Sequence, residues 1–269
     1  MEGKFNAKRS KVDILKFINE YLYVDKNAGE AVYSYFREQY LFCNEVPSNT
    51  KIIIEHYNNN EDEKKIIVHS LYGRRVSDCF SRALAFAVSR IYHKDIEMGI
   101  SDNGFYINAE SKINIIEALK AIKSKEINEV LNKAIEKSEI LKRRFRHCAV
   151  RSLMILKEYK GKKKRVGRQQ VSSMLLISAI RRISEDFPIL KEAKREVLED
   201  LMDIQNLKLI IEEIEKGKIE IKEVQTQIPS PFAFNLVLQG YTDILKFEDR
   251  MKFLRNMHQL VLAKINLKK

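Results

Sequence analysis

The stretch KIIIEHYNNNEDEKKIIVHS, residues 51–70, decides the fold that this sequence is expected to adopt. Two runs rich in β-branched residues, KIIIE at 51–55 and KIIVHS at 65–70, stand on either side of the polar segment NNNEDEK. Runs of this kind around a polar loop predict a β-hairpin. The hairpin begins a sheet, and the neighbouring sequence indicates how that sheet is extended and covered.

Two further segments are expected to extend the hairpin. Residues 96–100 and 105–108 flank the turn sequence SDNG, which predicts a second hairpin. The segment IEIKEVQ, residues 219–225, alternates apolar and polar residues as a half-buried strand does, so we expect it to return to the same sheet. Most of the chain beyond residue 111 has a helical pattern. The sequence therefore predicts an α+β fold, a mostly helical domain with a small antiparallel β-sheet.

The N-terminal residues 1–48 are expected to form a helical segment in front of this domain, which we place at residues 49–269. Apolar residues recur at helical spacing over 12–24 and again after a short polar break. Two helices joined by a tight turn are typical of a helix-turn-helix or winged-helix unit and equally of an ordinary helical hairpin. The dipeptide Pro-Ser at 47–48 marks the boundary.

Positive charge is concentrated in LKRRFRHCAVRSLMILKEYKGKKKRVGRQQ, residues 141–170. Between residues 141 and 168 twelve Lys or Arg stand against one acid, a net charge of +11, whereas the whole chain carries +12. No Pro or Gly interrupts 141–159, so we expect one helix there. Gly161 then breaks the pattern, and 162–168 is expected to be a mobile loop. A charge so concentrated favours a polyanion, with nucleic acid as the first candidate.

The basic side chains that we expect to contact phosphates form three groups. Inside the expected helix, none of its arginines has a Glu four residues away, and guanidinium groups suit bidentate phosphate binding. Those on the loop supply diffuse attraction. The third group is the pair Arg74 and Arg75, which follows Gly73. We expect this pair to lie just before a helix capped by Ser77, where backbone amides favour anions. An ordinary solvated surface is the alternative for each group. The candidate nucleic-acid-binding residues are Arg74, Arg75, Arg143, Arg144, Arg146, Arg151, Lys162, Lys163, Lys164, Arg165 and Arg168.

Several classes of function are disfavoured by motifs that the sequence lacks. There is no GxxxxGK[ST] loop, no DExD or DExH box, no HExxH and no GxSxG. Cys43, Cys79 and Cys148 form no CxxC pair, and His69 on its strand is expected to be a satisfied core or edge histidine. No apolar run is long enough for a membrane span, and the first residues, MEGKFNAKRSK, contain no apolar h-region, so we do not expect secretion. We therefore expect a cytoplasmic chain with no catalytic residue, metal or cofactor of its own.

Five ordered blocks of the sequence carry a resemblance to a known family. They are HSLYGRRVSDCFSRALAFA, SDNGF, RRFRHCAVRSLMILKEYKGKKKRVGRQQ, LEDLMD, and IPSPFAFNLVLQGYTD followed by EDR. Together they resemble the DEAD/H-associated region at the C-terminal end of the large helicase-related (Lhr) family of ATP-dependent helicases, in its archaeal form. The resemblance extends from about residue 14 to residue 265.

The resemblance implies a place next to a helicase motor. In that family two RecA-like motor domains come first, then a winged helix, then this region. ATP and Mg would therefore bind motor domains, in cis or in trans, whose motifs this sequence does not contain. Residues 1 to about 46 would be the tail of the winged helix or a remnant joined to it, and the remainder would pack against a single strand leaving the motor. A fragment, a split gene and a stand-alone domain all fit this pattern.

The function expected from these observations is a nucleic-acid-binding accessory domain that grips single-stranded DNA or RNA and has no ATPase activity by itself. Two alternatives belong to other classes. A stand-alone DNA-repair enzyme of glycosylase type would need an acid or amide poised over a flipped nucleotide. A protein-interaction module would instead dock onto a separate helicase motor.

Overall fold

The computed structural model describes residues 1–59, 63–108, 113–163, 165–239 and 247–267. The chain divides into two compact units. The first comprises Met1–Ser77, Asp95–Ile113 and Gly217–Lys269, and the second comprises Asp78–Lys94 and Asn114–Lys216. Helices and a small sheet share the chain, so the predicted α+β class is confirmed.

The first unit is built on a five-stranded sheet in the order β3-β4-β2-β1-β7. The strands are β1 (Lys51–Asn59), β2 (Glu63–His69), β3 (Glu97–Ser101), β4 (Gly104–Asn108) and β7 (Glu220–Thr226). Both predicted hairpins are confirmed, and β2 joins them by pairing antiparallel to β4.

The return strand β7 joins the sheet as predicted but runs parallel to β1. The sheet is therefore mixed, and the expectation of an antiparallel sheet is wrong at this strand. A tight turn between consecutive strands dictates antiparallel pairing, whereas a long connection permits either direction. The residues of β7 alone therefore do not determine its direction.

Gly104, the first residue of β4, allows the second hairpin to lie close to β2. Its φ of +147° is in a region that residues with side chains rarely adopt. A Cβ atom there would lie 2.1 Å from the carbonyl oxygen of Val68 on β2. The glycine is thus required by both the backbone conformation and the space.

Replacing Gly104 with Ala should lower the free energy of unfolding by about 1–3 kcal/mol, because the strained conformation and the contact with Val68 both oppose it. Urea unfolding checks this. Gly3→Ala, in helix α1 (Glu2–Asn6) with open space around its Cβ position, is the matched control and should not destabilise the chain. Equal stabilities of the two variants would contradict the assignment.

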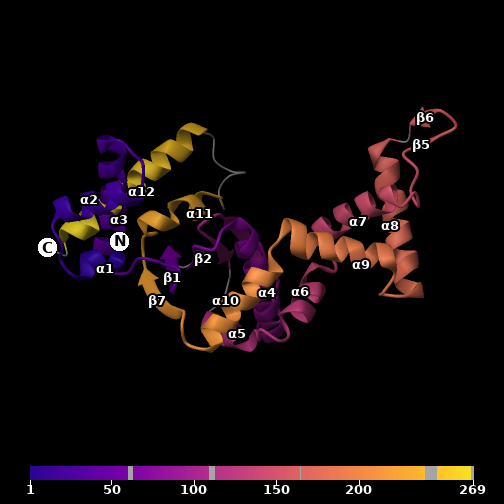
Figure 1. The fold of residues 1–269 in the computed structure, drawn as a ribbon, viewed down its shortest axis with the longest axis horizontal. Helices are drawn as coiled ribbons and strands as arrows, with labels where there is room; N and C mark the ends of the chain where they lie inside the picture. The colour runs from indigo at the N-terminus through magenta and orange to yellow at the C-terminus, as the bar shows by residue number, and fades with distance from the viewer. Residues whose placement is uncertain (60–62, 109–112, 164, 240–246, 268–269) are drawn as a thin grey trace. The chain divides into compact units, whose positions relative to one another are not determined.

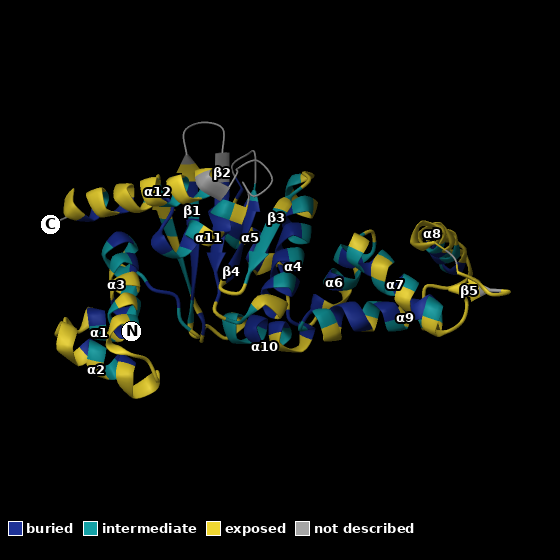
Figure 2. Cartoon of the chain, turned by 90° about the horizontal axis from the view of Figure 1, so that it is seen from above, coloured by how far each residue is buried: buried dark blue, intermediate teal, exposed yellow. Residues whose placement is uncertain are grey.

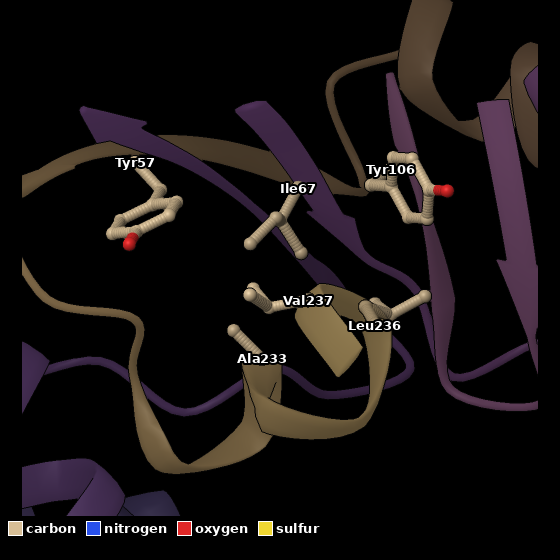
Figure 3. Packing of buried hydrophobic residues seen from close by; sticks show 6 residues of the cluster. All are labelled: Tyr57, Ile67, Tyr106, Ala233, Leu236 and Val237. Atoms are coloured by element: carbon tan, nitrogen blue, oxygen red, sulfur yellow. The ribbon is translucent and has the colours of Figure 1, made fainter. Parts of the chain in front are cut away.

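One apolar cluster joins the sheet to the segment that follows β7 (Figure 3). Tyr57, Ile67 and Tyr106 project from β1, β2 and β4. They meet side chains of the 3₁₀ turn η2 (Pro231–Ala233) and the short helix α11 (Phe234–Gln239). Burial of this surface holds α11 against the sheet.

A buried hydrogen-bond network anchors the same segment through Glu55 on β1. The Glu55 carboxylate accepts hydrogen bonds from Thr226 Oγ1 at 2.9 Å and from Ser230 N and Oγ at 2.8 and 2.6 Å. His69 Nε2 lies 2.9 Å from Glu55 Oε2, and both side chains are buried, so the predicted satisfied core histidine is confirmed. Burial raises the pKa of Glu55, but the bonds from His69 and Ser230 outweigh it and leave that pKa below its ordinary value.

The N-terminal residues are helical as predicted. Besides α1, they form α2 (Lys11–Tyr21) and α3 (Lys26–Cys43), which the side chains of Ser10 and Asp25 cap. The C-terminal helix α12 (Phe247–Leu267) packs on α3, where Val261 and Ile265 contact Phe42. The N-terminal helices therefore lie in the same compact unit as the sheet.

The second unit is helical apart from one small hairpin. Its helices are α4 (Arg74–Tyr92, which begins in the first unit), α5 (Ile115–Ala121), α6 (Ile127–Ile135), α7 (Glu139–Arg151), α8 (Val166–Ile183), α9 (Pro188–Arg195), the π-helical η1 (Glu196–Leu201) and α10 (Ile204–Glu215). Helix α7 lies beside both α8 and α9 (Figure 1). Within the described part of the chain, no helix has the length and apolarity needed to cross a bilayer.

Candidate nucleic-acid interface

Helix α7 carries the arginines of the basic window on a well-anchored element. Ser138 caps its first turn, and Leu141, Phe145 and Cys148 are among its buried residues, so one side of the helix is packed into the core. The helix ends at Arg151, so the expected helix over 141–159 is too long. Leu153 adopts a left-handed φ of +60°, and the N–H of Ile155 donates to the carbonyl of Ala149 at 3.0 Å, which turns the chain back.

The lysine-rich segment after α7 forms a β-hairpin where a loop was expected. Strands β5 (Glu158–Tyr159) and β6 (Lys162–Lys163) pair antiparallel. Lys160 and Gly161 both have positive φ, as the two central residues of a type I′ turn require. Lys162, Lys163, Arg165 and Arg168 are exposed on this hairpin and on the start of α8, whereas Lys164 lies outside the described residues.

One pair of arginines on α7 shares a buried carboxylate. Arg144 Nη1 lies 3.5 Å from Glu196 Oε2, and Arg151 Nη2 donates to Glu196 Oε1. The Glu196 side chain is only 6% exposed and belongs to η1, 45 residues beyond Arg151. Helical spacing reveals only acids one turn away on α7 itself, so this partner could not be found from the sequence.

A second pair, Arg143 and Arg146, faces a cavity of about 270 Å³ between α7 and α8. Among the residues that the structure describes, neither guanidinium has an ion-pair or hydrogen-bond partner. The cavity is also lined by Glu139, Lys142, Gln170, Ser173, Met174 and Ile177. Lys142 and the four α8 residues that line the cavity were not among the candidates. The α8 residues lie opposite the arginines only because of how the two helices pack.

The pKa of His147 is affected by burial and by the positive charges of the neighbouring arginines. Partial burial lowers the pKa of His147, and so do the nearby charges of Arg146, Arg144 and Arg151. The imidazole is therefore neutral at pH 7 and adds no charge to the surface.

Arg74 and Arg75 occupy the first turn of α4 and are exposed. The helix begins at Arg74, so these residues do not precede it as expected. Ser77 is within the helix, where its N–H donates to the carbonyl of Gly73 at 3.0 Å and its hydroxyl lies 3.4 Å from that of Ser70. The pair belongs to the first unit and the other candidates to the second, so the candidates form two separate groups.

The structure offers little for metal or thiol chemistry. In the described ranges, no group of three or more His, Cys, Asp or Glu side chains is arranged to hold a metal ion. Burial raises the pKa of Cys79 to about 12, and burial also raises the pKa of Cys148. Both thiols therefore stay protonated at neutral pH.

Comparison with known proteins places this arrangement in a family. Residues 46–233 match the family model described as DEAD/H associated. The chain belongs to the DEAD/H-associated family. The resemblance seen in the sequence blocks is thus confirmed.

Relatives of this family member include archaeal helicases. ATP-dependent helicase Lhr-Core of Methanothermobacter thermautotrophicus is 48% identical over 98% of this chain, which spans 31% of that protein. The Lhr-Core protein of Saccharolobus solfataricus is 39% identical over 93% of the chain, which spans 29% of it. The chain therefore corresponds to about a third of the length of these relatives.

A solved structure shares the fold. The structure of Mycobacterium smegmatis helicase Lhr bound to ssDNA and AMP-PNP superposes with a TM-score of 0.70 at 29% identity. The match covers 78% of this chain and 27% of that one. The chain is thus a helicase-associated region by family and by fold.

Proposed function

We propose that this chain grips single-stranded DNA or RNA as the accessory region of an Lhr-type helicase and has no ATPase activity by itself. The observation that carries the proposal is the set of cations on α7, the β5–β6 hairpin and the start of α8, which are exposed or half-buried. Phosphate binding by such groups is the main source of affinity for nucleic acids. The M. smegmatis Lhr helicase, whose solved structure is bound to ssDNA, supports the same partner. Motor domains, in cis or in trans, would complete the helicase.

The proposed contacts differ in how available they are. Arg143, Arg146, Lys162 and Lys163 are the first contacts, because no described carboxylate competes with a phosphate for them. Arg144 and Arg151 are partly neutralised by Glu196. Arg74 and Arg75 would add a separate contact from the first unit.

Direct binding tests this function. Fluorescence anisotropy with labelled single-stranded DNA and RNA, and with a blunt DNA duplex, should show binding at low salt that favours the single strands. Acidic polypeptide should compete poorly, because it lacks the regular phosphates of the strand. Failure to bind either single strand at low salt would sink the proposal, and ATP hydrolysis by the chain alone would overturn its non-catalytic part.

Replacing Glu196 with Gln should strengthen binding, because it releases two guanidinium groups from a carboxylate. One further phosphate contact to a single strand changes log affinity by about 0.7 per decade of salt, or about fivefold at 0.1 M salt. The anisotropy titration measures this change. Glu199→Gln, an exposed acid in the same turn that pairs with Arg195, is the control and should change affinity less. Unchanged affinity in a folded Glu196→Gln protein would show that the two arginines do not reach the strand.

A glycosylase function is the second candidate, favoured by the names of two relatives. The M. smegmatis Lhr helicase/probable uracil glycosylase is 29% identical over 82% of this chain, which spans 15% of that protein. The Escherichia coli Lhr helicase/uracil glycosylase is 28% identical over 73% of the chain, which spans 13% of it. An oligonucleotide containing uracil, treated with alkali after incubation, separates the two functions. Strand cleavage would establish the enzyme, whereas an intact strand that still binds agrees with the accessory function.

Docking onto a motor is the third candidate, favoured by exposed apolar residues of α8, a helix on which exposed positions are drawn yellow in Figure 2. These are Val166, Val171, Met174, Leu175 and Ile183. A helix face of this kind is typical of an interaction surface. Co-sedimentation with separately produced Lhr-Core motor domains tests it, and Val171→Lys with Leu175→Lys should abolish the association without lowering strand affinity.

A further inference from the structure

The cavity between α7 and α8 has two chemically different walls. Its volume of about 270 Å³ is at the lower limit for small-molecule sites, which suits a small polar ligand. The α7 wall presents cations, and the α8 wall presents an amide, a hydroxyl and apolar groups. Both walls belong to the second unit.

The α7 wall is suited to a phosphate. Its acid, Glu139, is already paired with Lys142 at 2.6 Å, so the charge of Arg143 and Arg146 is uncompensated within the cavity. These two arginines are three residues apart, which places them on the same side of the helix. Two planar guanidinium groups side by side can hold a single phosphate through several charge-assisted hydrogen bonds.

The α8 wall is suited to a nucleoside. Gln170, Ser173, Met174 and Ile177 have the spacing of one helix face. The Gln170 amide both donates and accepts hydrogen bonds, as the edge of a base or a sugar hydroxyl requires. Met174 and Ile177 offer apolar surface against which a base can lie. The pairing of a cationic wall with this one matches the two halves of a nucleotide.

We propose that the α7–α8 cavity holds one nucleotide of the bound strand. Arg143 and Arg146 bind its phosphate, while Gln170 and Ser173 bond to its sugar or base and Met174 contacts the base face. This inference rests on the proposed function and adds to it a defined binding site for one nucleotide. Arg144 and Arg151 do not form an equivalent phosphate site, because both guanidinium groups already pair with the buried carboxylate of Glu196.

The methyl resonance of Met174 provides a direct probe of the cavity. In the full chain labelled at methionine methyl groups, deoxyadenosine 5′-monophosphate at millimolar concentration should shift the Met174 signal. Met154, which is exposed in the turn after α7 and outside the cavity, should not shift. Inorganic phosphate and deoxyadenosine should each bind more weakly than the nucleotide. An unmoved Met174 signal overturns the proposal, and phosphate binding as tightly as the nucleotide overturns its nucleoside half.

Two variants test which groups hold the phosphate. Arg143→Gln with Arg146→Gln should weaken the nucleotide by about tenfold or more, because charge-assisted hydrogen bonds are lost. Lys137→Gln with Arg182→Gln removes the same charge from exposed positions outside the cavity and should leave nucleotide affinity unchanged. Gln170→Glu, at an exposed position, places a carboxylate opposite the arginines and should give a similar loss without disturbing α7. Equal nucleotide affinity in all variants would contradict the proposal that the nucleotide binds in this cavity.

The two proposals fail in different ways. If the chain binds single strands but the nucleotide leaves Met174 unmoved, the cavity inference fails and the proposed function stands. If neither the strand nor the nucleotide binds, both fail. If the nucleotide binds but the strand does not, the proposed function fails, and the cavity is a site for a free nucleotide and not for a nucleotide of a bound strand.

Discussion

Replacing Glu55 with Ala should lower the free energy of unfolding by about 3 kcal/mol or more, because several buried hydrogen-bonding groups lose their shared acceptor and each such loss costs about 1–3 kcal/mol. The substitution leaves His69 and the hydroxyls of Thr226 and Ser230 buried without their shared acceptor. It also releases the segment that carries α11. Since most domains are stable by only about 5–15 kcal/mol, this loss is a large part of the total. Urea unfolding followed by circular dichroism measures it.

The chain contains a matched control for Glu55. Glu223 Oε1 on β7 lies 2.8 Å from His56 Nε2 on β1. These two residues form another Glu–His pair on the same sheet, but the Glu223 side chain is 45% exposed. Glu223→Ala should cost less than about 1 kcal/mol, because solvent screens an exposed pair. Equal losses in the two variants would show that the buried network does not stabilise the fold.

The stability of the first unit should also depend on pH through Glu55. Its pKa in the folded chain is below the value of about 4.3 expected for an unfolded Glu. The stabilisation is therefore complete above the unfolded pKa and is lost as pH falls through the lower folded pKa. Between pH 7 and pH 3 the wild-type chain should lose more stability than Glu55→Gln, and parallel curves would contradict this account.

Reversing the charge of Arg143 and Arg146 should have the largest effect on strand affinity. Loss of two phosphate contacts weakens single-strand binding by about 25-fold at 0.1 M salt, and the added repulsion makes the loss larger. Anisotropy with single-stranded DNA measures this for Arg143→Glu with Arg146→Glu. Lys137→Glu with Arg182→Glu, which makes the same change in net charge outside the cavity, should cost much less. Equal losses would indicate attraction by net charge alone.

The same substitutions at Arg144 and Arg151 would be a poorer test. Either reversal would place a second carboxylate against buried Glu196. Such a variant is expected to lose stability, because an unpaired buried charge is costly. A binding defect there would therefore not distinguish a lost phosphate contact from a damaged fold.

Local patterns predicted much of this fold. The β-branched runs around residues 51–70 and the SDNG turn each determine a hairpin through short-range chemistry, and both hairpins are present. The apolar stripe of α7 was also predictable, because Leu141 and Phe145 recur at helical spacing. The direction of β7 was not predictable, because a long connection precedes this strand. The early end of α7 was not predictable either, because it depends on the left-handed backbone conformation of Leu153.

The candidate interface could be predicted in composition but not in geometry. The concentration of Lys and Arg is visible in the sequence, yet the pairing of Arg151 with Glu196 joins residues 45 positions apart. The wall that Gln170 and Ser173 form opposite Arg143 likewise depends on the packing of α7 against α8. Such contacts are set by tertiary structure and leave no local pattern.

The salt dependence of single-strand binding tests the central claim most directly. If five phosphate contacts form, log affinity should fall with log salt concentration at a slope of about −3.5, from about −0.7 per contact. Arg143→Gln with Arg146→Gln removes two contacts and should reduce the slope to about −2.1. A slope near zero in the wild-type chain, or the same slope in both proteins, would contradict the account.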